Sequence, residues 1–513
     1  MTARVGFVSL VGAGPGDPGL LTVKGRRAIE RADVVLYDLL AHPTLLDAVS
    51  VPGQERIHVG KLAGAGLSAQ EAINALLVKR ARAGERVCRL KGGDPLLFGR
   101  GSEEIEACLD AGIPFEVVPG VSSIQAAPAY AGIPLTHRDL ASSVTVATGH
   151  EKEAGGGRVD WAHVGGAGGT VVVLMGIGEI DRWTAGMLAG GRAAETPVAF
   201  VRWGTLPKQE TLVTTLGEAA AAVARAGLRS PCVAVVGEVV TLREHHAWFE
   251  RLPLQDQVIG LTRDTADDLS VFEPLVDMGA HLAWIPLTRK VPTAEAAHVA
   301  ARVRAGGFTD LVFTSGNGVR VVKDALDEAG LDARALAGVA TWAVGGQTAG
   351  AMRAVLGVGA DHVPAEATAE GLVALAQAVG VAGRRFLFPA ARDARRVMPE
   401  GLAALGAVVE QVPVYETVPE PSAEARLITA VDAGLSLVTV ASPSAVRTLA
   451  AAFDAAHIAR ASIPLAAIGP TTAAAAVKEG FRVPIVPATY TLADLVLAIV
   501  EAARAGELSR PRG

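Results

Sequence analysis

The sequence of 513 residues contains little cysteine, few aromatic side chains and few charged ones. Its three cysteines, Cys88, Cys108 and Cys232, stand far apart without metal-ligand spacing, so neither a disulfide framework nor a zinc site is indicated. Aromatic residues make up only 4% of the chain, which argues against a surface that stacks nucleic-acid bases. Charged residues make up 19% and hydrophobic residues 50%, a balance that favours packed cores over disorder.

A basic region and a long apolar run are also missing. The net charge is −6 and the charges are scattered, so no positive field would attract nucleic acid. There is no run of 18 apolar residues, and the first residues lack a signal-peptide cleavage region. We therefore expect a cytoplasmic protein with neither a nucleic-acid partner nor a membrane partner.

The patterning along the chain is that of an α/β protein with several compact units. A chain of this length predicts about three or four such units. Short β-branched runs alternate with alanine-rich and leucine-rich helical stretches, as in Val5–Val11 followed by Leu21–Arg31. A proline-containing linker near residue 254 predicts two domains, 1–253 and 258–505.

The second half of the sequence repeats itself. The matching pairs are FTSGNGVRVV from Phe313 with VASPSAVRTL from Val440, and AVGGQTAGAM from Ala343 with AIGPTTAAAA from Ala467. The order A, B, A′, B′ predicts two similar α/β lobes with a ligand cleft between them. We expect the chain to cross between these lobes at two strands, near 286–290 and 413–417.

Three glycine-rich turns follow strand-like runs in the first half: GAGPGDP, LKGGDP and PGVSS. The first lacks the Gly-Lys-Ser/Thr of a P-loop and the spacing of a G-x-G-x-x-G fingerprint, and alone it could be a tight structural turn. The second and third combine bare backbone with one carboxylate, Asp94, and two hydroxyls, Ser122 and Ser123. Such turns allow close backbone approach to a ligand and offer it hydrogen-bonding groups.

These turns are part of a longer series: GAGPGDP, YD, GK, LKGGDP, PGVSS, AAPAYAGIPLTHRD, MG, TPVA and VVGEVV. In that order they make residues 5–250 resemble the S-adenosylmethionine uroporphyrinogen-III C-methyltransferases of the tetrapyrrole methylase family. The resemblance implies a two-lobed α/β domain with S-adenosylmethionine bound between the lobes, and a homodimer formed through this half. The residues that match the family's S-adenosylmethionine pocket are Pro15, Gly92, Gly93, Asp94, Ser122, Ser123, Met175, Gly204, Pro231 and Cys232.

Two further residues match the family's catalytic groups. Asp38, in VLYD, matches its proposed proton acceptor, and Lys61, in HVGK, matches its proposed proton donor. From the residues alone, Asp38 could equally be a helix N-cap and Lys61 a solvated surface lysine. A sulfonium methyl is already activated, so positioning and one general base would suffice for methyl transfer, without a metal.

The sequence departs from the family after both of these motifs. Family members often carry arginine there, whereas this chain has Leu39 and Leu62. If those arginines hold substrate carboxylates, other residues must replace them. We expect Arg138 and Arg202 to do so.

Residues from about 258 to 501 resemble uroporphyrinogen-III synthase, through LTR, IPL, FTSGNGV, AVGGQTA, PVYET, ASPSAV and AIGPTTA. The resemblance implies a two-lobed, duplicated α/β domain that closes hydroxymethylbilane with inversion of its last ring and needs no cofactor. VGGQTA replaces the family's more usual Gly-Pro in the first B repeat.

That substrate bears eight carboxylates, so its site needs hydrogen-bond donors at helix N-termini more than a nucleophile. The expected substrate contacts are Ser315, Asn317, Ser442, Ser444, Thr471 and Thr472. As helix caps, these residues would need no function. Tyr415 is expected to assist departure of the hydroxyl group, although it could instead be a core residue of a hinge strand.

Together the resemblances predict a bifunctional enzyme that makes uroporphyrinogen III and methylates it twice to precorrin-2. One alternative is a second half that senses tetrapyrroles without catalysis, which an appended helix-turn-helix domain would favour. Another alternative is that the first half methylates a different corrinoid. The segments GKLAGAG and PLTHRD instead favour uroporphyrinogen as the substrate. Whether the product feeds sirohaem or cobalamin synthesis stays open.

Overall fold

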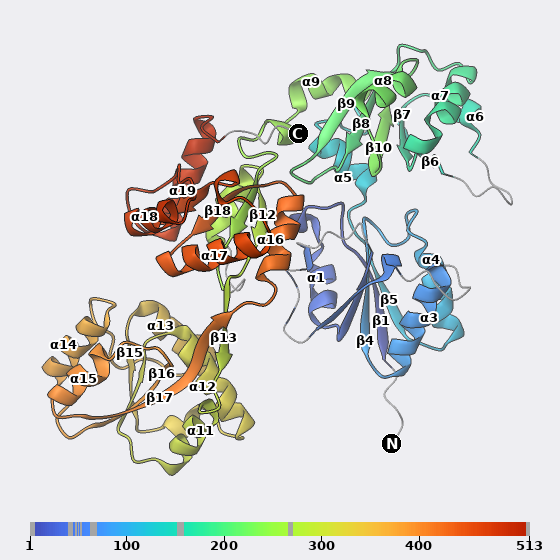
Figure 1. Ribbon diagram of the computed structural model, residues 1–513. Coiled ribbons are helices and arrows are strands. Elements are labelled where there is room, and N and C mark those ends of the chain that lie inside the picture. The colour runs from blue at the N-terminus through green and yellow to red at the C-terminus, as the bar shows by residue number, and fades with distance from the viewer. Residues whose placement is uncertain are drawn as a thin grey trace. The chain divides into compact units, whose positions relative to one another are not determined.

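The computed structural model describes residues 6–508 apart from 39–44, 47–48, 50, 52–53, 62–68, 151–158 and 265–269. The chain divides into two compact units. Unit 1 comprises Met1–Thr262, Ala266–Ile285 and Ala425–Gly513, and unit 2 comprises Arg263–Thr265 and Pro286–Glu424. Both units are built from sheets covered by helices, so the predicted α/β class is confirmed (Figure 1).

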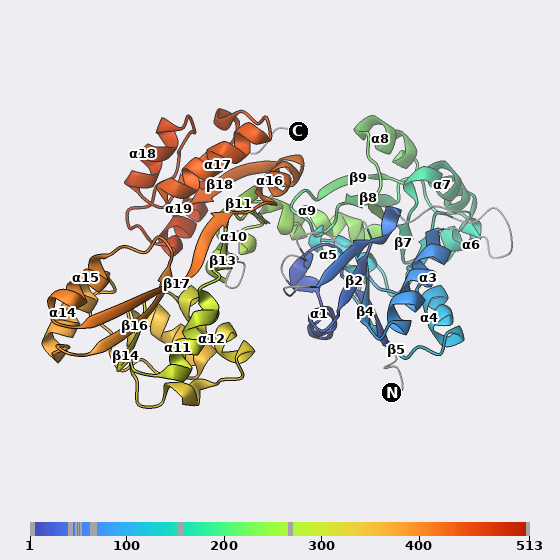
Figure 2. The same ribbon diagram turned by 60° about the horizontal axis from the view of Figure 1, so that its bottom comes forward.

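The first sheet of unit 1 is parallel and has the strand order β3-β2-β4-β1-β5. Its strands are β1 (Phe7–Gly12), β2 (Val34–Tyr37), β3 (Glu55–His58), β4 (Arg86–Lys91) and β5 (Phe115–Val118). Alternate strand residues pack against two helical layers, α1 (Val23–Glu30) on one face and α3 (Ala69–Arg82) with α4 (Gly101–Asp110) on the other (Figure 2). All strands therefore end at the same edge, where such sheets carry their ligand sites.

The second sheet of unit 1 is mixed and has the order β6-β7-β10-β8-β9. Its strands are β6 (Val144–Thr148), β7 (Thr170–Leu174), β8 (Pro197–Arg202), β9 (Glu210–Thr215) and β10 (Cys232–Val236). The helices on one face are α6 (Trp161–Gly166), α7 (Ile180–Ala189) and α8 (Ala219–Ala226). Helix α5 (Ser123–Tyr130) covers the other face, and the short α9 (Arg243–His246) follows β10.

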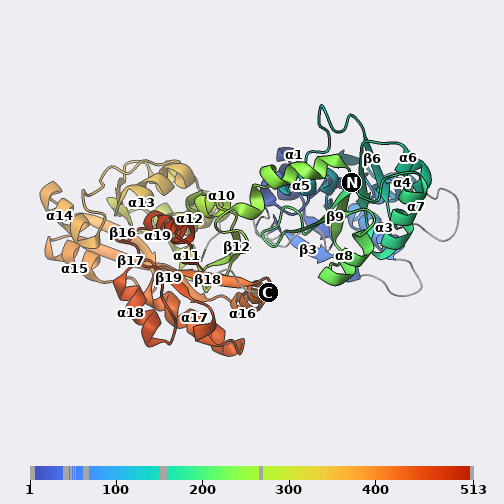
Figure 3. The same ribbon diagram turned by 90° about the horizontal axis from the view of Figure 1, so that it is seen from above.

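The remainder of unit 1 is a parallel sheet with the order β12-β11-β18-β19. Its strands are β11 (Val258–Leu261), β12 (His281–Trp284), β18 (Leu435–Val440) and β19 (Leu465–Ala467). Its helices are α10 (Glu273–Asp277), α16 (Ala423–Asp432), α17 (Pro443–Ala455), α18 (Pro470–Lys478) and α19 (Leu492–Arg504). Helix α19 lies on one side of β18 and β19 and α17 on the other, so this sheet too is covered on both faces (Figure 3).

Unit 2 contains one sheet with the order β13-β17-β16-β14-β15, in which only β13 is antiparallel to its neighbour among the described strands. Its strands are β13 (Thr288–Pro292), β14 (Asp310–Phe313), β15 (Ala340–Ala343), β16 (Arg385–Ala391) and β17 (Val408–Pro419). Helices α11 (Ala296–Ala305), α12 (Gly316–Glu328) and α13 (Gly346–Ala351) pack on one face. Helices α14 (Ala369–Val379) and α15 (Val397–Ala404) pack on the other (Figure 1).

The two copies of the sequence repeat have matching local geometry. Ser315 and Ser442 are the extended N-cap residues of α12 and α17, with φ −157° and −159°. Gly345 and Gly469 likewise precede α13 and α18. One copy lies in unit 2 and the other in unit 1, which matches a duplicated fold.

The predicted linker near residue 254 is packed in the structure. Leu254 is fully buried in a core cluster with Phe272. Gln255 donates from Nε2 to the carbonyl oxygens of Pro207, at 2.7 Å, and Gln209, at 3.2 Å. The exact domain limits stay predictions. Within the described residues, no helix combines the length and apolar character needed to cross a membrane.

Candidate functional site

The loops after β1, β4 and β5 meet at the carboxyl edge of the first sheet. Gly93 N donates to Gly14 O at 2.7 Å, and Gly14 N donates to Gly93 O at 3.2 Å. A Cβ atom on Gly12 would lie 2.5 Å from Gly120 Cα, so only glycine allows these loops to approach so closely. Pro15 follows Gly14 in the same group of loops. We call these three closely packed glycines, Gly12, Gly93 and Gly120, the glycine ledge.

Asp94 ties two of these loops together. Its Oδ1 accepts hydrogen bonds from Leu96 N at 2.9 Å and Leu97 N at 3.1 Å, and its Oδ2 accepts one from Gly120 N at 3.1 Å. The carboxylate therefore shapes the glycine ledge from within. Because a carboxylate has about four acceptor positions, contact with a ligand remains compatible with these bonds and stays a prediction.

Ser122 and Ser123 stand beside the glycine ledge at the start of α5. Ser122 is the N-cap residue, and its hydroxyl accepts from Ile124 N at 3.3 Å. A Cβ atom on Gly93, whose φ is +66°, would lie 3.9 Å from Ser122 Cα and from Ser123 N. The two serines thus lie next to Gly93, and their contact with a cofactor stays a prediction.

The first glycine loop also contacts the loop that follows β8. Asp17 N donates to Thr205 Oγ1 at 3.1 Å, and the Tyr130 hydroxyl donates to Asp17 Oδ2 at 2.6 Å. A Cβ atom on Gly204 would lie 2.4 Å from Ala127 Cβ in α5. The structure therefore brings Gly204 to the helix that begins with the two serines.

The remaining predicted pocket residues lie at one edge of the second sheet. Met175 follows β7 with φ +53° and is 48% exposed, whereas Cys232 begins the neighbouring β10. Pro231 O accepts from Trp203 N at 3.5 Å, next to Gly204. Burial raises the pKa of the Cys232 thiol to about 12, so this cysteine is not a reactive thiolate.

Asp38 lies at the end of β2, next to charged residues of β4. Arg89 Nη2 lies 3.4 Å from Asp38 Oδ2, and Arg89 Nε donates to Glu104 Oε1 at 3.0 Å. Lys91 Nζ donates to the same Glu104 oxygen at 2.9 Å, and burial lowers the pKa of Lys91 from its ordinary value. Asp38 is half-buried, with a cation on its inner side.

Parts of the predicted catalytic region lie outside the described residues. Lys61 ends the 3-10 helix η2 (Val59–Lys61), and its side chain is outside them. Leu39 and Leu62 are outside them as well. The role of Lys61 and the effect of these leucines stay predictions.

The two predicted substrate arginines have different surroundings. Arg202 ends β8, and its Nη1 pairs with Glu210 Oε1 at 2.7 Å. Its Nε atom is buried and has no hydrogen-bond partner among the described residues. Arg138 is exposed, in a turn where His137 N donates to Ala141 O at 2.9 Å. Of the two, only Arg202 has a buried unsatisfied donor among the described residues, and the substrate role of both stays a prediction.

In unit 2 the predicted synthase residues Ser315 and Tyr415 are in contact. The Ser315 hydroxyl lies 3.0 Å from the Tyr415 hydroxyl and accepts from Gly318 N at 3.2 Å. Tyr415 is 7% exposed in β17. Asn317 Oδ1 accepts from Arg320 Nη1 at 3.2 Å, on the outer side of the same helix start.

The other predicted synthase residues lie in unit 1. The Ser442 and Ser444 hydroxyls are 3.0 Å apart at the start of α17. Thr471 is exposed and Thr472 is buried, both in the first turn of α18. Each group lies at a helix N-terminus, as the repeat predicts.

Sequence reasoning missed Arg89 and Glu104 as neighbours of Asp38. The available signal was the motif RLK within an otherwise apolar strand, because buried cations require an acidic partner. The partner comes from α4, a separate element, and spacing alone could not identify it.

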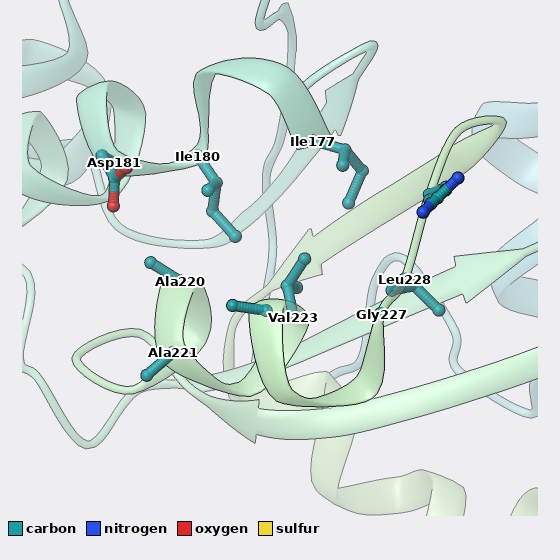
Figure 4. Close-up of a pocket in the computed structure, with 10 residues that line it drawn as sticks. Ile177, Ile180, Asp181, Ala220, Ala221, Val223, Gly227 and Leu228 are labelled. Atoms are coloured by element: carbon teal, nitrogen blue, oxygen red, sulfur yellow. The ribbon is translucent and has the colours of Figure 1, made fainter.

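A surface groove of about 500 Å³ lies between α7 and α8 (Figure 4). Its walls are mostly apolar, with Ile177 and Ile180 opposite Val223, and with Asp181 at one end. None of the predicted site residues lines it. The groove lies in the helical layer of the second sheet and offers no set of convergent polar groups.

Comparison with known proteins identifies two families along the chain. A family model described as tetrapyrrole (corrin/porphyrin) methylases matches residues 8–220, and one described as uroporphyrinogen-III synthase HemD matches residues 271–497.

Two relatives match stretches of this chain that are longer than either family match. The porphyrin biosynthesis protein HemD of Ruminiclostridium josui is 39% identical over 362 residues, 70% of this chain and 71% of that protein. The uroporphyrinogen-III C-methyltransferase of Bacillus subtilis is 39% identical over 339 residues, 66% of this chain and 69% of that protein.

A solved structure titled uroporphyrin-III C-methyl transferase from Thermus thermophilus complexed with S-adenyl homocysteine is 42% identical. It covers 46% of this chain and 99% of that chain, with a TM-score of 0.39. Several siroheme synthases also match, and the chain spans about half of their length, 51% to 54%. The two family matches and the two relatives at 39% identity show that the chain belongs to the tetrapyrrole methylase family through its first half and to the uroporphyrinogen-III synthase family through its second half.

Proposed function

We propose that this chain is a bifunctional tetrapyrrole enzyme. The second half cyclises hydroxymethylbilane to uroporphyrinogen III with inversion of the last ring, and the first half methylates that product twice to precorrin-2. The observation that carries the proposal is the presence of both family matches in one chain, together with a relative that is 39% identical over 70% of this chain.

The glycine ledge is compatible with S-adenosylmethionine. Its glycines carry no side chains, which lets three loops pack closely together. Ser122, Ser123 and Asp94 lie next to these glycines. When bound, S-adenosylmethionine supplies an activated methyl group. The residues proposed to hold it are Pro15, Gly92, Gly93, Asp94, Ser122, Ser123, Met175, Gly204, Pro231 and Cys232.

The chain's own groups then handle the substrate and its proton. Half-buried Arg202 binds a carboxylate of the substrate through its guanidinium group, and exposed Arg138 offers a second contact. Asp38 accepts the proton that the methylated ring releases, and Lys61 donates a proton where one is needed. The adjacent Arg89 keeps the Asp38 carboxylate on one side of the site.

In the synthase half, Tyr415 is the proposed acid. Ser315 Oγ already accepts from Gly318 N, so its own hydrogen is available for the Tyr415 oxygen. The phenol hydrogen of Tyr415 is then free to pass to the departing hydroxyl group, which leaves as water. Asn317, Ser442, Ser444, Thr471 and Thr472 donate to substrate carboxylates at helix N-termini.

One incubation series tests the proposal. Purified full-length chain is given hydroxymethylbilane with and without S-adenosylmethionine, and the products are oxidised to porphyrins and separated by isomer. The type III isomer without added cofactor, and a dimethylated product with it, are expected. Only the type I isomer, which unassisted closure gives, would contradict the synthase assignment. Mass photometry of the same preparation tests the proposed homodimer.

A further inference from the structure

Three buried charged residues contact one another where α4 packs on the first sheet: Arg89 and Lys91 in β4, and Glu104 in α4. Arg89 is 2% exposed, Lys91 is 4% exposed and Glu104 is 0% exposed. Buried ion pairs generally stabilise a fold no better than apolar residues of similar size, because desolvation offsets the attraction. Their presence next to Asp38 therefore calls for a role other than packing.

Arg89 is held on several sides and bridges two carboxylates. Its Nε donates to Glu104 Oε1 at 3.0 Å, and its Nη1 donates to Leu90 O at 2.9 Å and Leu36 O at 3.4 Å. Its Nη2 is directed at Asp38 Oδ2, at 3.4 Å. The rigid planar guanidinium therefore fixes the direction from which Asp38 is contacted.

The charges balance only when Asp38 is included. Arg89 and Lys91 carry two positive charges, and Glu104 carries one negative charge. Gln70, a neutral residue, donates to the same Glu104 oxygen at 3.1 Å. The charged groups that act on Lys91 are Arg89, Glu104 and Asp38. One positive charge thus remains in this cluster, and half-buried Asp38 brings a second carboxylate to within 3.4 Å of Arg89.

We propose that Arg89 and Glu104 are positioning residues for the methylase reaction: Glu104 orients Arg89, and Arg89 holds the ionised Asp38 carboxylate towards the substrate. This inference rests on the proposed function of Asp38 as proton acceptor. Lys91, which leads directly into Gly92 and Gly93, shares Glu104 and links the cluster to the glycine ledge.

A double-mutant cycle on the full-length chain tests the proposal. Methylation of supplied uroporphyrinogen III is measured for wild type, Arg89→Lys, Asp38→Asn and the double variant. Lysine keeps the charge but cannot bridge both carboxylates, so Arg89→Lys should lower kcat roughly 10-fold to 100-fold. Its KM and the affinity for S-adenosylhomocysteine should stay within about twofold. In the Asp38→Asn background, Arg89→Lys should have no further effect on kcat, because the two residues act through one group.

Two further variants make the result decisive. Glu104→Gln keeps the shape of the buried side chain and should reproduce the kcat loss with the same lack of additivity. Arg80→Lys is the matched control, since Arg80 bridges Glu55 and Glu85 at the amino ends of β3 and β4, and it should leave kcat unchanged.

One contrary result is that Arg89→Lys lowers kcat equally in both backgrounds, in variants that unfold at the wild-type temperature. That result would show that the cluster has only a structural role; it would overturn this inference but leave Asp38 as the proposed base. Wild-type kcat in Asp38→Asn would overturn both the inference and the base assignment. If Arg89→Lys fails to fold, the same double-mutant cycle with Glu104→Gln in its place tests the inference.

Discussion

The methylase half gathers its candidate site around glycine backbone at one sheet edge, whereas the synthase half distributes its candidate residues over helix N-termini in two compact units. In the first half, Gly12 and Gly120 approach each other and Gly93 so closely that a side chain on Gly12 or Gly120 would clash. In the second half, Ser315 and Ser442 serve as N-caps of equivalent helices in different units. A site of the first kind is specified by local motifs, and one of the second kind by a duplicated fold.

The difference also affects how substitutions should act. Contacts in the methylase site join neighbouring loops, so one change should disturb several groups. In the synthase half, the Ser315–Tyr415 contact is confined to unit 2, and the hydroxyls of unit 1 contact one another. We therefore expect a substitution in one half to leave the other half's reaction intact.

The largest effect is expected from Asp38→Asn. Loss of the general base should slow methylation about 100-fold or more, with S-adenosylhomocysteine affinity nearly unchanged. Stopped assays with supplied uroporphyrinogen III measure the rate, and synthase activity of the same sample is the internal control. A normal methylation rate would return Asp38 to a helix-capping role.

The next largest effect is expected from Tyr415→Phe. The phenylalanine keeps the buried ring but removes the hydroxyl that contacts Ser315, so synthase turnover should fall about 10-fold to 100-fold, the range expected for a lost hydrogen bond to a developing charge. The type III to type I ratio is measured after oxidation. Ser315→Ala should cause a smaller loss in the same direction, and methylation should be unaffected in both. Loss of methylation would contradict the separation of the two sites.

A moderate effect is expected from Asp94→Ala. The carboxylate accepts from three backbone N–H groups of the glycine loops, and removing a partly buried acceptor typically costs ~1–3 kcal/mol. Affinity for S-adenosylhomocysteine, measured by calorimetry, should fall about tenfold. Asp94→Asn, which keeps one acceptor oxygen, should lose less. An unchanged affinity in folded Asp94→Ala would remove this residue from the cofactor pocket.

The smallest effect is expected from separating the halves. Fragments 1–253 and 254–513 should keep methylation and type III synthesis, respectively. The cut removes the two Gln255 side-chain hydrogen bonds and the backbone bonds from Gln255 N to Leu252 O and from Asp256 N to Pro207 O, each worth a net ~0.5–1.5 kcal/mol. We therefore expect a decrease in stability and little change in either activity. A fragment that begins at 258 lacks buried Leu254 and should be less stable by about 2–5 kcal/mol. Denaturant unfolding compares the fragments, and a 254–513 fragment that makes only the type I isomer would show that the synthase needs the first half.

Much of the fold follows from sequence, because strand and helix periodicity are local. The repeat around Ser315 and Ser442 predicts equivalent caps, and the structure has them. The meeting of the glycine loops follows from parallel strands that end at one edge. The Arg89–Glu104–Asp38 cluster could not be predicted, because it needs β2 and β4 as neighbours and α4 beneath them. The Ser315–Tyr415 contact joins residues 100 positions apart and depends on the strand order of unit 2.

The interrupted chain path of unit 1 has a consequence for synthesis on the ribosome. Strand β11 takes its neighbour β18 from beyond the whole of unit 2, and Val258 N bonds to Ser436 Oγ across 178 residues. At about 5–20 residues per second, β11 waits roughly 10–35 s for this partner. Unit 2, whose sheet is continuous in the chain from β13 to β17, can form in that interval. A nascent chain that stalls before β18 therefore leaves one edge of the apolar strand β11 unpaired, and that edge is open to pairing with other chains until β18 is made.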